Sequence, residues 1–270
     1  MQKEIHPVKY RKAAILPRVK LFNRVKWLLK EKYHNKPTRQ FAKDIQRLKN
    51  GEPRDYVIGF VEFLGCKINL SKKPLIPRPE TEYWMQKAID TVSLNLNGRP
   101  NFEVKILDIF SGSGCSGVSV MLHVKNTKVV FVDKGKKCID QIKINCALNK
   151  INKKRYKIIT SDVFSNVTGK YDYIFANPPY IAKTSQKKIQ KSVLLYEPKM
   201  ALFGGEDGLF YIRKFLKKAC GHLVSGGKIY MEFDSIQKFA IEKLINAYQY
   251  KNFTFYKDQY NKYRWVVISN

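Results

Sequence analysis

The chain has 270 residues, of which 44% are hydrophobic, and a net charge of +29 from 51 basic and 22 acidic side chains. This length and apolar content can bury a substantial core, and no apolar run approaches the roughly 20 residues that a membrane-spanning helix needs. The basic excess indicates a polyanionic neighbour such as ribosomal RNA or other nucleic acid, but a lysine-rich surface can also be solvated without binding anything.

Residues 1–50 form a basic N-terminal segment, with fifteen Lys and Arg against three Asp and Glu. Within it, the stretch LPRVKLFNRVKWLLKEKY places Leu21, Val25, Leu28 and Leu29 on one face of a helix whose other face is basic. A mitochondrial transit peptide can share this pattern, but such peptides favour Arg and Ser over Lys. We therefore predict a short helical segment that docks a substrate, in preference to a targeting peptide.

Residues 51–80 predict a β-hairpin connector. The stretches YVIGFVEFLG and CKINL are rich in β-branched and aromatic residues, and glycine and proline punctuate them.

From residue 81 to residue 270, strand and helix patterns alternate. Apolar runs predict strands at 104–110, 128–132, 156–160, 171–176 and 228–233, and helical patterns fall at about 115–124, 135–149, 206–222 and 236–248. Such alternation predicts an α/β fold with a largely parallel sheet that helices cover on both faces. The tail adds two strand candidates, FTFYK and YRWVVIS, which we expect to pair antiparallel at one side of the sheet.

The residues just after each strand carry the functional signal, because ligands of such sheets bind beyond the carboxyl ends of the strands. Gly112 and Gly114 open the helix after the first strand, where glycine lets the backbone approach a ligand closely. A Gly-x-Gly turn or a terminal Asp is also common for structural reasons. One nucleoside-bearing ligand would account jointly for the polar residues at all four strand ends, which are Asp108, Asp133, Asp162 and Asn177. Asp133, at the end of the second strand, is placed to accept the ribose hydroxyls.

The fourth strand decides which ligand class is favoured. The pattern Gly112-x-Gly114-x-x-Gly117 would suit a dinucleotide, but hydride transfer does not call for the Asn-Pro-Pro-Tyr that follows this strand at 177–180. Two consecutive prolines stop both helix and ladder, and they fix the backbone there.

Asn-Pro-Pro-Tyr suits methyl transfer to a planar nitrogen. An amide or exocyclic amine nitrogen is a poor nucleophile, because its lone pair is delocalised into the adjoining π system. Asn177 can accept one N–H of such a group through its side-chain oxygen, the Pro178 carbonyl can accept the other, and Tyr180 can form an aromatic wall. Orientation and electrostatic stabilisation then carry the catalysis without a dedicated strong base, so we predict Asn177, Pro178 and Tyr180 as catalytic residues.

This pattern resembles the S-adenosylmethionine-dependent methyltransferases that act on planar nitrogens. The connector from 56 to 82, the stretch LLYEPKMALFGGEDGL at 194–209 and the tail with Asp258 and Arg264 resemble the release factor glutamine methyltransferases of the HemK/PrmC family. The likeness covers roughly residues 52–270, and Arg-Pro-Glu-Thr-Glu at 78–82 is its most specific element. It implies a Rossmann-like, mostly parallel seven-stranded sheet with an antiparallel last strand.

The resemblance also implies roles for individual residues. The S-adenosylmethionine site would comprise Asp108, the loop Phe110, Ser111, Gly112, Ser113 and Gly114, Asp133 on the ribose, Asp162, Val163 beside the adenine, and Asn177. The substrate glutamine of the Gly-Gly-Gln motif would lie against Asn177, Pro178, Pro179 and Tyr180, with Arg78, Pro79, Thr81, Glu82 and Glu197 shaping the pocket. Thr81 would also serve as a helix N-cap. No metal is implied.

Two features depart from the family pattern. Phe110 stands where the family usually has glycine, and the region before the connector is shorter than the family's helical N-terminal domain. We expect the basic face of this region to touch ribosomal RNA or an acidic patch on the release factor.

Three alternatives remain at this stage. An adenine-N6 DNA or RNA methyltransferase would share Asn-Pro-Pro-Tyr but needs a target-recognition domain and room for a flipped base. A ribosomal-protein glutamine methyltransferase resembles the connector less well. A basic RNA-binding module on an inactive methyltransferase fold would leave the intact motifs unexplained.

The cysteines bear on the compartment. No two of the five cysteines form a Cys-x-x-Cys motif: they are Cys66, Cys115, Cys138, Cys146 and Cys220. This pattern is typical of a reducing compartment, and we expect the cysteines to be ordinary core residues. We expect a cytoplasmic, monomeric enzyme with no membrane segment, an organellar matrix being the less favoured location.

Overall fold

The computed structural model describes residues 18–96 and 102–269, so residues 1–17 of the predicted basic segment lie outside the described part. The described chain begins with α1 (Arg18–Tyr33), α2 (Arg39–Lys49) and α3 (Arg54–Ile58). The predicted apolar face of the first helix is present: Leu28 is fully buried against Leu48 and Val57, and Leu21 and Val25 pack at the edge of this cluster.

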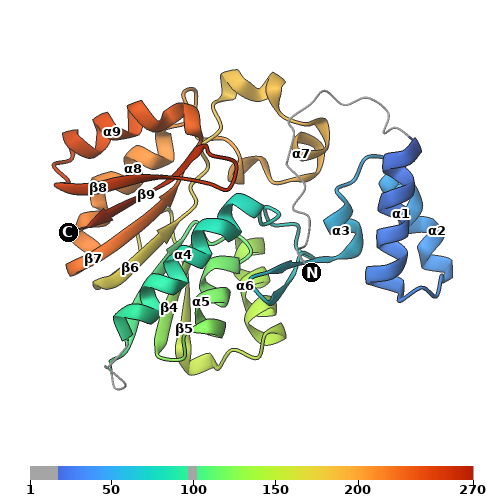
Figure 1. The fold of residues 1–270 in the computed structure, drawn as a ribbon, viewed down its shortest axis with the longest axis horizontal. Coiled ribbons are helices and arrows are strands. Elements are labelled where there is room, and N and C mark those ends of the chain that lie inside the picture. The colour runs from blue at the N-terminus through green and yellow to red at the C-terminus, as the bar shows by residue number, and fades with distance from the viewer. Residues whose placement is uncertain (1–17, 97–101, 270) are drawn as a thin grey trace.

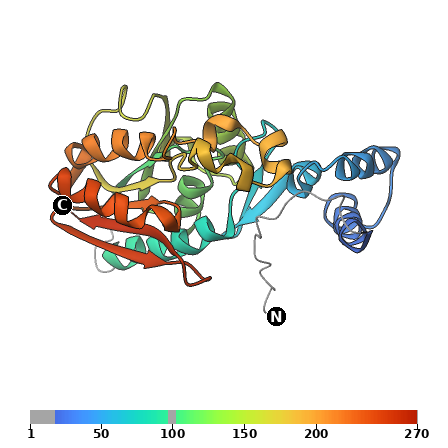
Figure 2. The same cartoon turned by 90° about the horizontal axis from the view of Figure 1, so that it is seen from above.

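A buried carboxylate ties these helices together. Asp44 on α2 accepts hydrogen bonds from Lys32 Nζ and Tyr33 Oη on α1, both at 2.7 Å, and pairs with Arg47 at 2.9 Å. Burial acts to raise the pKa of Asp44, but these donors outweigh it and the pKa lies at about 2. Lys32 also donates to the Val57 carbonyl at 2.8 Å, so α3 joins the same unit. Figure 2 shows α1 and α2 at one end of the molecule.

The connector contains the predicted hairpin, but the hairpin starts later than expected. Strands β1 (Phe60–Phe63) and β2 (Cys66–Asn69) pair antiparallel. Residues 56–58, which we predicted to lie in the first strand, instead form the last turn of α3, which Gly59 ends in the left-handed conformation at φ 100°. A short apolar run of sequence is compatible with either a strand or a helix. Here the run packs against α1 and α2, and it is helical.

Within the described residues, seven strands form one sheet in the order β5-β4-β3-β6-β7-β9-β8. The strands are listed in chain order: β3 (Val104–Ile109), β4 (Thr127–Asp133), β5 (Tyr156–Thr160), β6 (Tyr171–Ala176), β7 (Leu223–Glu232), β8 (Asn252–Lys257) and β9 (Tyr263–Ser269). Strands β3 to β7 pair parallel with one another, and β9 runs antiparallel to both β7 and β8. The predicted mostly parallel sheet with an antiparallel last strand is confirmed.

Helices cover both faces of this sheet (Figure 1). One face packs against α4 (Pro79–Leu96), α5 (Cys115–His123) and α6 (Lys136–Leu148), and the other against α8 (Phe210–Ala219) and α9 (Lys238–Ala247). Each face of the sheet has its own hydrophobic core, and successive residues of β3 point to opposite faces. Ile106 packs in the core on the α4–α6 face and Leu107 in the core on the α8–α9 face. No helix of the described residues has the length and apolar character needed to cross a membrane.

Two stretches differ from the sequence prediction. The helix expected from 206 begins at Phe210, because Gly205 and Gly208 adopt left-handed conformations and the loop packs against the residues after β6. A side chain at Gly208 would place its Cβ 2.3 Å from the Tyr180 carbonyl oxygen. The sequence prediction placed a helix N-cap at Thr81 but gave no bounds for α4, and it missed the short helix α7 (Lys191–Tyr196), which lies between β6 and α8.

Candidate active site

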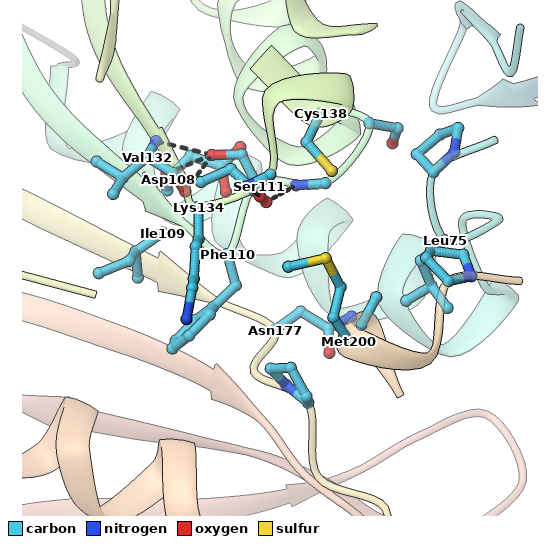
Figure 3. Close-up of a pocket in the computed structure, with 18 of the residues that line it drawn as sticks. Leu75, Asp108, Ile109, Phe110, Ser111, Val132, Lys134, Cys138, Asn177 and Met200 are labelled. Atoms are coloured by element: carbon cyan, nitrogen blue, oxygen red, sulfur yellow. Dashed lines mark hydrogen bonds between the residues drawn. The ribbon is translucent and has the colours of Figure 1, made fainter. Parts of the chain in front are cut away.

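A cavity of about 310 Å³ lies at the carboxyl ends of β3, β4, β5 and β6. The chain crosses from one side of β3 to the other between β5 and β6, so the cavity lies at the point where strand order reverses. Figure 3 shows Asp108, Phe110, Ser111 and Asn177 around it. Many of the residues proposed from sequence line this cavity: Arg78, Thr81, Asp108, Phe110, Ser111, Gly112, Ser113, Asp133, Asp162, Val163, Asn177 and Pro179.

The loop after β3 is held by its neighbours. Ser111 Oγ donates to the Asp108 carbonyl at 2.6 Å and accepts from the Val132 amide at 2.9 Å. Asp133 Oδ2 accepts from the Gly112 amide at 2.8 Å, which ties the loop to the end of β4. Gly112 has φ 55°, and a Cβ there would meet no atom closer than 3.9 Å. The loop backbone is therefore open toward the cavity at this position.

Besides Lys73, two residues other than glycine adopt the left-handed conformation beside the cavity. Phe110 has φ 61° and Val163 has φ 56°. This conformation costs about 1–2 kcal/mol for a residue with a Cβ, and Val163 is also β-branched. The Phe110 ring packs edge-on against Tyr211, with 5.9 Å between the ring centroids. A glycine at this position would lack this contact. Both strained residues line the cavity, which is typical of a functional site.

Two glycines of the predicted dinucleotide-like pattern act through packing. Gly114 does not line the cavity, and a Cβ there would lie 3.1 Å from Ile142 on α6. At Gly117 a Cβ would lie 2.3 Å from the Phe131 ring of β4, so this glycine lets α5 lie close to the sheet. The left-handed φ of 78° and the contact with α6 give Gly114 a structural role, and its contact with the donor stays a prediction.

The three acids at the strand ends differ in environment. Burial raises the pKa of Asp108 to about 7. A hydrogen bond from the Gly117 amide at 3.0 Å acts in the opposite direction and lowers this pKa. Burial also raises the pKa of Asp133, and the amides of Gly135 and Gly112 oppose this shift. A hydrogen bond from Lys214 at 2.6 Å lowers the pKa of Asp162, which is half-exposed.

Asp108→Asn is expected to raise the midpoint of thermal unfolding at pH 8 by roughly 5 °C or more and to leave it nearly unchanged at pH 4. The folded protein holds a proton on Asp108 up to pH about 7, whereas the unfolded chain releases it near pH 4, so wild-type stability falls as the pH rises through this window. The asparagine removes this loss, and its oxygen can still accept from Gly117. Calorimetric melts at both pH values test it.

Asp162→Asn is the matched control, because Lys214 lowers the pKa of Asp162 and neutralising that acid should give no gain at pH 8. An equal rise at pH 4 and pH 8 for Asp108→Asn would contradict the titration argument.

A second cavity, of about 50 Å³, adjoins the first. Pro178 and Tyr180 line this smaller cavity, and Leu75, Arg78, Asn177 and Ala201 line both. Asn177 therefore lies between the two. Its Nδ2 donates to Thr81 Oγ1 at 3.3 Å, and the Tyr180 hydroxyl donates to Glu232 at 3.0 Å.

The Arg-Pro-Glu-Thr-Glu segment divides between the cavities and the scaffold. Arg78 Nη2 pairs at 2.7 Å with Glu197, whose buried carboxylate also accepts from the Ile76 amide, so Glu197 supports the wall rather than lining it. Pro79 begins α4 and lines neither cavity. The prediction that Thr81 is a helix N-cap is wrong, because Thr81 lies inside α4. Glu82 lines neither cavity and accepts from the Leu64 amide of the hairpin turn at 2.8 Å, so its part in the substrate pocket stays a prediction.

Several residues of the site were not predicted. Glu232 at the end of β7 is a buried acid in the apolar run KIYMEF, the same signal that singled out Asp108. Lys134, Met200 and Tyr211 also line the larger cavity. Cys138 lines it too and is only half-buried, and Cys220 is exposed, so the prediction that all five cysteines are core residues fails for these two.

The tail pair noted in the sequence forms a buried ion pair. Arg264 Nε lies 3.1 Å from Asp258 Oδ2 across the β8–β9 turn, and Arg264 lines the smaller cavity.

Comparison with known proteins defines the class first. Residues 86–206 match the model of the methyltransferase small domain. Among solved structures, the hMettl16 catalytic domain in complex with the MAT2A 3′UTR hairpin 6 has a TM-score of 0.59 at 14% identity, covering 77% of this chain and 76% of that one. The N-terminal domain of human METTL16 in complex with SAH has a TM-score of 0.53 at 13% identity, covering 77% and 76%. The fold is that of a Rossmann-like methyltransferase.

Sequence relatives define the family. The release factor glutamine methyltransferase of Lactococcus lactis is 31% identical over 249 residues, covering 91% of this chain and 88% of that protein. The protein of the same name in Francisella tularensis is 34% identical over 221 residues, covering 82% and 75%. The chain belongs to the release factor glutamine methyltransferase family.

Proposed function

We infer that the protein transfers a methyl group from S-adenosylmethionine to the side-chain amide nitrogen of the glutamine in the Gly-Gly-Gln motif of release factors. The observation that carries this inference is the position of Asn177 between a nucleoside-sized cavity and a small one lined by Pro178 and Tyr180. Family membership supports the same reaction.

The larger cavity fits the donor in size and chemistry. Its volume of about 310 Å³ lies at the lower end of the range of small-molecule sites. Gly112 leaves open the space that a side chain would fill. Asp133 lies at the end of β4, where its carboxylate can bind a ribose. Val163 and Phe110 offer apolar surface to the adenine ring. Bound S-adenosylmethionine supplies an electrophilic methyl group on a positively charged sulfur. The buried acid Asp108 gives this side of the cavity a negative potential when ionised.

The residues around the smaller cavity hold the acceptor. Asn177 Oδ1 accepts one N–H of the glutamine amide, and the Pro178 carbonyl accepts the other. These acceptors turn the nitrogen lone pair toward the larger cavity and stabilise the positive charge that grows on nitrogen during transfer. Tyr180 bounds the plane of the amide. The proton leaves after transfer, so a strong base is not required.

A mass-spectrometric assay tests the function. The purified protein is mixed with S-adenosylmethionine and a release factor, with a Gln→Ala variant of the tripeptide motif and bare DNA as parallel substrates. One added methyl group on the tripeptide glutamine, absent from the variant, is the expected result. Methylation of DNA without methylation of the factor would overturn the inference in favour of an adenine methyltransferase.

We also propose that the basic N-terminal helices dock an acidic partner surface, on the release factor or on ribosomal RNA, and that the enzyme works as a cytoplasmic monomer. Replacing the exposed Lys26, Lys30 and Lys43 with Glu is expected to raise KM for the release factor by ~5-fold or more at low salt and to flatten its salt dependence. These lysines lie outside the Asp44 cluster, so the fold should persist.

The control is an equal charge reversal at Lys217, Lys218 and Lys251, which are exposed on the α8 and β8 side of the molecule. An equal change of KM in both triple variants would show that the total charge matters and that the N-terminal helices do not dock the partner.

A further inference from the structure

A buried carboxylate lies behind Asn177 and has no role in the transfer as described above. Glu232, at the end of β7, is 1% exposed. Its Oε2 accepts from Thr81 Oγ1 at 2.6 Å and from Trp84 Nε1 at 2.8 Å, both on α4, and its Oε1 accepts from the Tyr180 hydroxyl at 3.0 Å. Thr81 in turn contacts Asn177 Nδ2 at 3.3 Å. Three side chains from α4 and β7, those of Thr81, Trp84 and Glu232, are thus linked to Asn177 and Tyr180 of the Asn-Pro-Pro-Tyr corner.

The directions of the hydrogen bonds that connect Trp84, Glu232 Oε2, Thr81 and Asn177 are fixed. An indole N–H can only donate, so Glu232 Oε2 must accept from Trp84. Thr81 has one hydroxyl hydrogen, which the short contact directs to the same oxygen. Its own oxygen can then only accept, so the group of Asn177 that faces Thr81 must be the amide NH₂.

Ionisation of Glu232 does not reverse this direction. Burial raises the pKa of Glu232, while Thr81, Trp84, the charge of Arg264 and Tyr180 lower it. A proton on this carboxyl would reside on Oε1, because Oε2 already receives two donors, and the Tyr180 oxygen can accept it. Thr81 donates to Oε2 in both cases.

We propose that Thr81, held by Glu232, is a positioning residue that sets the orientation of the Asn177 amide so that its oxygen faces the acceptor nitrogen. The oxygen and nitrogen of an asparagine amide have nearly the same size, so packing alone cannot choose between the two orientations, and only hydrogen bonds can. The inverted amide would present N–H groups to a substrate that itself offers N–H groups. This inference rests on the proposed function, since it assigns the support of the same site.

Thr81→Val is the central test, with Thr81→Ser as the matched control. Valine keeps the shape and removes the acceptor for Asn177, and we expect kcat to fall ~10-fold or more, with donor affinity and KM for the release factor changed by less than ~2-fold. Serine keeps the hydroxyl and should retain kcat within ~2-fold. Equal losses in both variants, or a loss confined to KM, would overturn the proposal.

A double variant separates positioning from general damage. If Thr81 acts only through Asn177, adding Thr81→Val to Asn177→Ala should lower the residual single-turnover rate by less than ~2-fold. A further ~10-fold loss in that background would show that Thr81 acts in another way.

Glu232→Gln tests whether Glu232 holds Thr81 in place or instead acts as a general base. The glutamine oxygen can occupy the Oε2 position and its NH₂ can donate to Tyr180, so the chain of hydrogen bonds survives and kcat should stay within ~3-fold. Glu232 also lines the smaller cavity, where a general base could stand. A ~100-fold loss in this variant would overturn positioning in favour of proton abstraction. Wild-type methylation of the tripeptide glutamine reports the proposed function separately, because all these outcomes are ratios to wild type.

Discussion

Asn177→Ala is expected to lower kcat for glutamine methylation by ~10³-fold while donor affinity changes by less than ~3-fold. The variant removes the acceptor that holds the nitrogen in line with the methyl group, and losses of this size are usual when one positioned hydrogen-bonding group of an active site is deleted. Single-turnover rates and calorimetric titration of the donor measure the two quantities separately.

Asn152→Ala provides the matched control, because Asn152 is exposed and caps a 3₁₀ turn that leads into the amino end of β5, whereas the cavity lies at the carboxyl end of that strand. It should leave kcat within ~2-fold. A rate for Asn177→Ala within ~10-fold of wild type would refute the assignment of Asn177 as the residue that orients the acceptor.

Asp133→Ala is expected to weaken donor binding by ~100-fold, which corresponds to about 2.7 kcal/mol. Asp133 Oδ2 holds the Gly112 amide and Oδ1 holds the Gly135 amide, both at 2.8 Å, so the variant loses the brace of the donor loop together with the proposed acceptor for ribose. One hydrogen bond from a ribose hydroxyl to a charged carboxylate, at about 1.5–3 kcal/mol, accounts for a loss of this size. Isothermal titration with S-adenosylmethionine measures it.

Asp162→Ala distinguishes a specific role of Asp133 from a general effect of negative charge. The Asp162 carboxylate is already paired with Lys214 at 2.6 Å, so its removal should weaken donor binding by less than ~10-fold. If both variants bound the donor equally well, Asp133 would have no special part in the site.

The class of fold and the edge of the sheet where the site lies both follow from local patterns in the sequence. Alternating strand and helix patterns specify parallel strands, and parallel strands bring all their carboxyl ends to one edge. Asp108, Asp133 and Asn177 could therefore be assigned to one cavity from their places in the chain alone. The last strand's pairing also followed, because two tail strands joined by a short turn must run antiparallel.

The directions in which neighbouring side chains point depend on how the elements pack, which local sequence patterns do not show. Thr81 and Glu82 are consecutive on α4, yet Thr81 faces the site and Glu82 faces the hairpin, because successive residues of a helix point about 100° apart and the position of α4 was not predicted. Thr81 and Glu232 meet across 151 positions of sequence, which no local pattern can indicate. The acid at the end of β7 was visible in the sequence, but its function depends on the helix that packs against it.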